Sequence, residues 1–345
     1  MRHLQSLTPL RGIAALTVLM FHLARNSGDS SLPAFFLRGY LGVDLFFVLS
    51  GFVLTHVYVQ GFLGDTSWRS AGAFLWARVA RIYPVHFFVT ALLVACGGAQ
   101  GLSGLDVLDN FLLILVPWPV HSINQPSWSL SAEWYAYLLF PLMVGWLWRC
   151  NGRIAAAICF ALLLGLDIAI IGSFGDLREV GGGWGALARA LPEFTLGVIT
   201  YRAFSDPHAA RIWRSDVAFL AVAGALAVAF EFMPNDGIIV ALLPLLLLAA
   251  VRNTGLAARV LNAAPLRWMG DISYSVYLGQ AFAFSAVLTL ATTPLGPALG
   301  LDGLRALAVV FALAIGALIY RCVEVPCRAL LRRAPDQLRR LAARA

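Results

Sequence analysis

The chain has 345 residues, of which 60% are hydrophobic and only 12% charged, and its mean hydropathy is +0.79. Soluble domains carry about 25% charged residues, so the excess apolar surface must face lipid, and the same composition excludes disorder. The net charge of +7 does not indicate a nucleic-acid-binding protein, because all 25 cationic residues are arginines that separate apolar runs of membrane-spanning length. We expect an all-α, multi-pass membrane protein whose partner is the lipid bilayer and which binds no nucleic acid.

Apolar segments of about 20 residues predict ten transmembrane helices. A shorter piece at 105–117 ends in Pro117-Trp118-Pro119 and is expected to be interfacial or re-entrant. The first segment is expected to be a retained span and not a cleaved signal peptide, because His22 interrupts it and no cleavage pattern follows. The ten segments lie near 10–26, 41–60, 84–99, 129–148, 154–172, 187–203, 216–231, 237–251, 272–291 and 304–321.

The arginine distribution predicts the orientation, since cytoplasmic loops are the basic ones. With ten spans and a cytoplasmic N-terminus, 20 of the 25 arginines fall in inner segments. An eleventh crossing at 105–117 would place the basic C-terminus outside. We therefore expect both termini in the cytoplasm, a transmembrane domain over 1–329 in the cell (inner) membrane, and a basic cytoplasmic tail at 330–345. The outer segments keep Arg25, Arg38, Arg178, Arg189 and Arg305.

Five cysteines are scattered along the chain without CxxC pairs or metal-type spacing to histidine. We expect neither a disulfide nor a metal site.

The first span carries two ionisable residues, Arg11 and His22, which are functional candidates because charge is costly inside a bilayer. At about 100° and 1.5 Å per residue, they share one stripe of the helix and lie about 16 Å apart. A snorkelling arginine and a hydrogen-bonded core histidine are the alternative explanation. Asp44, near the outer end of the next span, is at a depth where its carboxylate can orient the His22 imidazole.

Ser50 is a weaker candidate for a triad with His22 and Asp44. It lies six residues from Asp44 and hence about 120° around the helix. Ser50 and Gly51 are more typical of a close helix contact.

Arg78 and Arg81 are three residues apart at the predicted inner start of the third span. Their guanidinium groups point the same way and suit a phosphate clamp, and positive-inside anchoring is the alternative. Glu133 lies about a turn inside the fourth span among aromatic residues, where an interaction with the helix dipole is the alternative to a catalytic role.

The last two spans carry polar residues with expected structural roles. Ile272-Ser-Tyr-Ser-Val-Tyr-Leu278 is expected to pack through polar contacts. Glu324 and Arg328 are expected to form a charge pair at the inner edge, with the helix ending at Pro326.

Six sequence blocks resemble motifs of the acyltransferase-3 family of integral-membrane acyltransferases and occur in the same order as in that family. The family is O-acetyltransferase-like. Together the six blocks span nearly the whole chain. They are Arg11-x10-His22, the Gly-Val-Asp44-Leu-Phe-Phe block ending in Ser50-Gly51-Phe52, Arg78-x-x-Arg81-Ile-Tyr-Pro84, Trp128-Ser129-Leu-Ser-x-Glu133, Ile272-Ser-Tyr-Ser-x-Tyr-Leu278 and Glu324-x-Pro326.

The resemblance implies transfer of an acyl group, usually acetyl, from cytoplasmic acyl-CoA to a hydroxyl of a glycan or glycolipid acceptor. Acyl-CoA is then a co-substrate, and no cofactor is bound permanently. The essential histidine of the family corresponds to His22, its basic partner to Arg11, and the donor-side arginine pair to Arg78 and Arg81. The chain departs from the family at Gly279-Gln280, where a second histidine is common. Many members also carry a C-terminal esterase-like domain, and we expect none in this protein.

We expect His22 to act as general base, with Asp44 or Glu133 stabilising its imidazolium form. Ser50, Trp128 and Ser129 are expected to contact substrate. Direct transfer and a covalent acyl-enzyme both remain open. Two alternatives to an acyltransferase are considered. The first is a small-anion transporter, which the absence of an internal repeat in the sequence disfavours. The second is a membrane sensor that binds acyl-CoA without catalysis.

Overall fold

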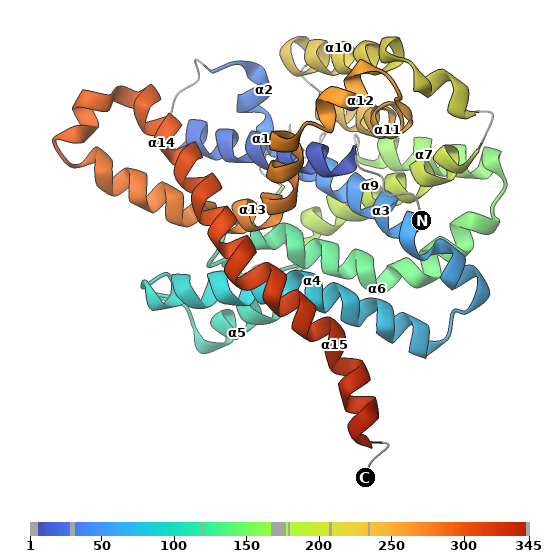
Figure 1. The fold of residues 1–345 in the computed structure, drawn as a ribbon, viewed down its shortest axis with the longest axis horizontal. Coiled ribbons are helices and arrows are strands. Elements are labelled where there is room, and N and C mark those ends of the chain that lie inside the picture. Colours follow the sequence, from blue (N-terminus) through green and yellow to red (C-terminus); the bar gives the residue numbers. More distant parts are fainter. Residues whose placement is uncertain are drawn as a thin grey trace.

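The computed structural model describes residues 6–27, 32–118, 120–166, 177–178, 180–206, 209–233 and 235–342, and within them it contains helices and no strand. The helices pack into one bundle, and the last of them projects beyond it toward the C-terminus (Figure 1). The all-helical fold predicted from the sequence is confirmed.

Each of the ten predicted segments overlaps one long helix, although the part of 154–172 beyond 166 lies outside the described residues. These helices are α1 (Leu7–Ser27), α3 (Gly42–Gly64), α4 (Trp68–Ala95), α6 (Ser127–Arg149), α7 (Gly152–Leu166), α9 (Gly183–Ser205), α10 (Asp216–Phe232), α11 (Asp236–Arg252), α13 (Ala264–Ala291) and α14 (Leu295–Ile319). Shorter elements are α2 (Ala34–Leu37), η1 (Gly39–Leu41), α5 (Gly104–Leu112), η3 (Ala209–Arg214) and α12 (Leu256–Leu261).

Five helical stretches in the described residues are long and apolar enough to cross a membrane: Leu7–Arg25, Gly39–Gly64, Trp68–Ala95, Ala264–Ala291 and Leu295–Arg333. They support a multi-pass membrane protein, while the count of ten and the orientation remain predictions. Helix α5, in the 105–117 piece, has nine residues. It is therefore about 14 Å long, roughly half the thickness of the hydrocarbon core.

Helix α4 begins sixteen residues before the predicted start of the third span at 84. Its N-cap is Ser67, whose side chain accepts a hydrogen bond from the backbone N–H of Ser70. The helix continues through Pro84. Arg78 and Arg81 therefore lie inside this helix, and their position at the inner start of the membrane span stays a prediction.

The prediction that the last helix ends at Pro326 is wrong. After α14 the chain forms a π-helical turn, η4 (Tyr320–Glu324), and continues as α15 (Val325–Ala342). Pro326 lies directly after the π-helical turn, and the helix continues past it. The predicted boundary at 330 falls within this continuous helix.

Glycines allow a close contact between two helices near the site. A Cβ at Gly51 of α3 would overlap the backbone carbonyl of Phe194 of α9, and a Cβ at Gly197 of α9 would overlap the carbonyl of Val48. The close approach expected at Gly51 is confirmed, and it brings α3 against α9.

Candidate active site

Two cavities adjoin each other, since Val43 and Tyr277 line both of them. The first, of about 150 Å³, is called the arginine cavity and is lined in part by Arg11, Ser50, Arg78, Arg81, Ser129 and Glu133. The second, of about 290 Å³, is called the histidine cavity and is lined in part by His22, Arg25, Trp128, Arg178 and Arg189.

The arginine cavity brings together the three arginines predicted to bind the donor. Arg78 donates a hydrogen bond of 3.2 Å to the Tyr58 hydroxyl, and its guanidinium carbon lies 5.5 Å from the Tyr58 ring centroid and 6.0 Å from that of Tyr137. These rings fix the direction of the guanidinium group toward the cavity.

Arg81 is held by an ion pair with the buried carboxylate of Glu324, and its guanidinium carbon lies 5.1 Å from the Tyr274 ring centroid. The other oxygen of Glu324 accepts a 2.8 Å hydrogen bond from Ser275. The predicted pairing of Glu324 with Arg328 is confirmed at 3.7 Å. Glu324 therefore joins α4, α13 and α15 at one side of the cavity.

His22 lies on α1 at the histidine cavity, half-buried. Its ring centroid is 5.2 Å from that of Phe21 and 6.3 Å from that of Phe284. Arg11, on the same stripe of α1, lines the other cavity. The helix thus presents Arg11 to one cavity and both His22 and Arg25 to the other.

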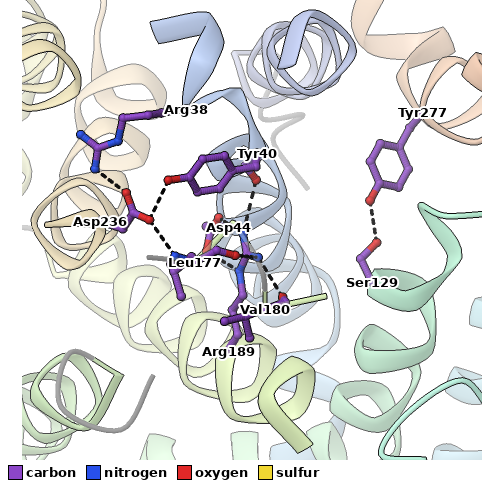
Figure 2. A network of polar contacts seen from close by, with 9 residues as sticks. All are labelled: Arg38, Tyr40, Asp44, Ser129, Leu177, Val180, Arg189, Asp236 and Tyr277. Atoms are coloured by element: carbon purple, nitrogen blue, oxygen red, sulfur yellow. Dashed lines mark hydrogen bonds and ion pairs between the residues drawn. The ribbon is translucent and has the colours of Figure 1, made fainter. Parts of the chain in front are cut away.

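Asp44 forms a fully buried ion pair with Arg189 of α9 (Figure 2). Arg189 Nε and Nη2 donate to the two carboxylate oxygens of Asp44 at 2.9 and 2.5 Å. Glu133 lines the arginine cavity, whereas His22 lines the histidine cavity. No hydrogen bond of the described residues joins either carboxylate to His22, and their catalytic roles stay predictions.

The three predicted substrate contacts lie at the cavities or between them. The Ser50 hydroxyl is 3.4 Å from that of Tyr137 at the arginine cavity. Ser129 and Tyr277 share a 2.8 Å hydrogen bond between their hydroxyls, in the partition that separates the cavities (Figure 2). Trp128 lines the histidine cavity, with its ring 5.4 Å from the guanidinium carbon of Arg189.

The role of Arg189 was not predicted from the sequence, because the arginine distribution assigned this residue to an outer segment. The residue is 2% exposed and lies within α9. A signal was available, because Arg189 and Glu193 are four residues apart within the predicted span at 187–203, and charges so placed indicate a functional or structural site.

A family model described as an acyltransferase domain matches residues 4–321. The chain therefore belongs to the acyltransferase-3 family, as the ordered motifs predicted. No solved structure matches it.

Several curated proteins are similar to the chain. It is 35% identical over 180 residues to acyltransferase MdmB of Streptomyces mycarofaciens, covering 45% of each chain. It is 27% identical to the exopolysaccharide production protein ExoZ of Rhizobium meliloti, covering 91% of this chain and 95% of ExoZ. It is 24% identical to the peptidoglycan O-acetyltransferase OatA of Listeria monocytogenes, covering 95% of this chain and 56% of OatA. The chain thus matches about half the length of MdmB and OatA.

Proposed function

We propose that the protein is an O-acyltransferase of the cell (inner) membrane, which moves an acyl group, with acetyl as the expected case, from acyl-CoA to a hydroxyl of a glycan or glycolipid. The observation that carries the proposal is the pair of adjoining cavities, one with three arginines and the other with His22. The names of ExoZ and OatA support a polysaccharide acceptor.

The donor binds at the arginine cavity. Acyl-CoA is polyanionic, and guanidinium groups bind phosphate in a planar, two-point geometry. Arg78 is held by aromatic rings and Arg81 by Glu324, so both are oriented before the donor arrives. The acyl-pantetheine arm then extends past Arg11 toward the partition at Val43 and Tyr277.

The acceptor binds at the histidine cavity, with its hydroxyl at His22. The neutral imidazole of His22 takes the hydroxyl proton while the oxygen forms a bond to the thioester carbonyl carbon. The carbon–sulfur bond breaks, and the proton passes from His22 to the CoA thiolate, which leaves as the thiol. In the direct route no bond to the protein is formed.

Acyl transfer requires the thioester to move from the arginine cavity, past Val43 and Tyr277, to the acceptor hydroxyl in the histidine cavity. The Ser129–Tyr277 hydrogen bond lies there. In this proposal it breaks when donor and acceptor are both bound, because the reacting atoms must come within about 3–3.5 Å of each other.

The purified protein, reconstituted in nanodiscs with radiolabelled acetyl-CoA and a glycan extract, tests the proposal. We expect label to appear on glycan and to be removed by mild base, as for an ester. Binding of acetyl-CoA without transfer or hydrolysis would favour the sensor. Uptake of a labelled small anion into proteoliposomes without acyl transfer would favour the transporter.

A further inference from the structure

A third cavity, of about 250 Å³, is lined by the last two turns of α3 and the first two turns of α4. It is called the aromatic cavity, because half of its lining residues are aromatic and the other half are small. These residues are Tyr58, Gly61, Phe62, Ser70, Ala73 and Phe74. Such a lining suits a flat ring system, which can lie against aromatic side chains where small residues leave room.

The aromatic rings of this cavity are fixed by contacts with one another. The Tyr58 and Phe74 rings pack edge to face with their centroids 5.0 Å apart, and the Phe62 and Phe74 rings do so at 5.6 Å. Phe62 and Phe74 are buried, whereas Tyr58 is partly exposed. Tyr58 therefore has the ring on which a flat ligand can stack. Gly61 and Ala73 are exposed and keep one side of the cavity open.

Arg78 connects the aromatic cavity to the arginine cavity. It lines the arginine cavity, and its guanidinium carbon lies 5.5 Å from the ring centroid of Tyr58 and 5.8 Å from that of Phe74. Its Nε is buried and has no hydrogen-bond partner among the described residues. Buried donors are normally paired, so this one indicates that a ligand supplies the acceptor. An anionic group bound there lies directly beside the aromatic cavity.

The two cavities follow one another along the same pair of helices. Lining residues recur every three or four positions on one stripe of α4, namely Ser70, Phe74, Arg78 and Arg81. The same spacing holds on α3, which runs through Ser50, Leu54, Tyr58 and Gly61. Ser70 is about 12 Å from Arg78 along the helix axis, at 1.5 Å per residue. In the ten-span topology predicted from the sequence, the aromatic cavity is on the cytoplasmic side of the arginine cavity.

We propose that the aromatic cavity binds the adenine ring of the acyl-CoA donor, which stacks on Tyr58 while the diphosphate lies at Arg78 and Arg81. The inference rests on the proposed function, because it takes acyl-CoA as the donor. One ribose separates the adenine of CoA from its diphosphate, and the pantetheine arm leaves the other end of the diphosphate. The order adenine, diphosphate and thioester then matches the order of the aromatic cavity, the arginine cavity and the partition before the histidine cavity.

Photolabelling of the full chain in nanodiscs tests where the adenine ring lies. The probe is a CoA analogue with an azide on its adenine ring, and the labelled peptides are identified by mass spectrometry with and without excess acetyl-CoA. We expect label that acetyl-CoA removes on the segment 58–74. Label that acetyl-CoA removes only from other segments would overturn the inference and leave the donor in place.

The variant Ala73→Leu tests the contact energetically, because the larger side chain fills the aromatic cavity. Two probes are compared by calorimetry: acetyl-CoA, and acetyl-phosphopantetheine, which carries the same thioester arm without the adenosine. We expect affinity for acetyl-CoA to fall at least about 10-fold, as when a base loses an aromatic stacking contact, and affinity for acetyl-phosphopantetheine to stay unchanged. Gly72→Leu is the matched control, since Gly72 is exposed on the same turn and a Cβ there meets nothing within 4 Å.

The outcomes separate this inference from the proposed function. Unchanged acetyl-CoA affinity in Ala73→Leu, as expected if a lipid chain fills the aromatic cavity, would overturn the inference. An equal loss for both probes would also overturn it, because the defect would not concern the adenosine. Labelling of 58–74 without any acyl transfer would support the inference and refute the proposed function alone. Absence of acetyl-CoA binding to the wild-type protein would refute the proposed donor and the inference with it.

Discussion

At the residue scale, Arg78 and Arg81 of the arginine cavity each have an aromatic or ionic partner that orients the guanidinium group. Arg78 lies among the rings of Tyr58 and Tyr137, and Arg81 is paired with Glu324. Positive-inside anchoring does not require such contacts, since an anchoring side chain needs only to reach water or headgroups. The geometry therefore favours anion binding over anchoring.

Arg78→Ala and Arg81→Ala should each weaken acetyl-CoA binding, because each removes a charge-assisted contact worth about 1.5–3 kcal/mol. Lysine should restore binding only in part, because it cannot form the planar two-point contact. Equilibrium binding to the purified variants measures this, with Arg69→Ala as control. Wild-type affinity for acetyl-CoA in both alanine variants would show that these arginines only anchor the protein in the membrane.

Asp44→Asn should lower stability as well as activity. It leaves Arg189 with an unbalanced charge at a fully buried site, and breaking such a pair costs about 3–5 kcal/mol. Thermal unfolding of the detergent-solubilised variants measures the loss. The double variant Asp44→Asn/Arg189→Gln should lose less than the sum of the single variants. Strict additivity would show that the pair is not coupled.

Much of the candidate site follows from the sequence, because helical periodicity determines which residues share a face. The alignment of Arg11 with His22 and of Arg78 with Arg81 is of this kind. The partner of Asp44 was not predictable in the same way, because Arg189 is 145 residues away and reaches it only through the packing of α9 on α3. Periodicity within one helix carries no information about such a contact.

At the scale of elements, the close crossing of α3 and α9 depends on two glycines, Gly51 and Gly197. Gly51→Ala or Gly197→Ala would place a methyl group into the backbone of the facing helix. We expect a loss of about 1–3 kcal/mol or more from the resulting separation of the helices, visible as a lower unfolding temperature. The separation should also disturb the Asp44–Arg189 pair, which joins the same two helices.

Gly61→Ala is the control for this prediction. Gly61 lies on α3 as well, but a Cβ there would meet nothing within 4 Å. Alanine also favours the helix over glycine by about 1 kcal/mol, so this variant should be neutral or slightly more stable. Equal destabilisation by all three substitutions would show that the close crossing is not the cause.

The existence of the helices was predictable, but several of their ends were not, and two of these ends have a clear physical reason. The start of α4 depends on the Ser67 cap, which lies in a stretch too polar to appear in a search for apolar segments. The continuation through Pro326 depends on a π-helical turn whose backbone shift has no signature in hydropathy.

At the scale of the whole molecule, the proposed function requires the two cavities to open toward opposite sides of the membrane. Reporter fusions after Ala345 and in the 202–215 loop should both report a cytoplasmic location, because 20 of the 25 arginines fall on that side in the ten-span topology. A reporter active outside the cytoplasm at either site would contradict this topology.

The most direct test of the central claim is acyl transfer by His22→Gln. Glutamine can still pack and hydrogen-bond at the histidine cavity, but it cannot accept a proton as imidazole does. Since general-base catalysis contributes about 10²–10⁴-fold, we predict a stable variant with unchanged acetyl-CoA affinity whose transfer of radiolabelled acetyl to glycan falls at least about 100-fold. Near-wild-type transfer by a folded, donor-binding His22→Gln variant would contradict the account.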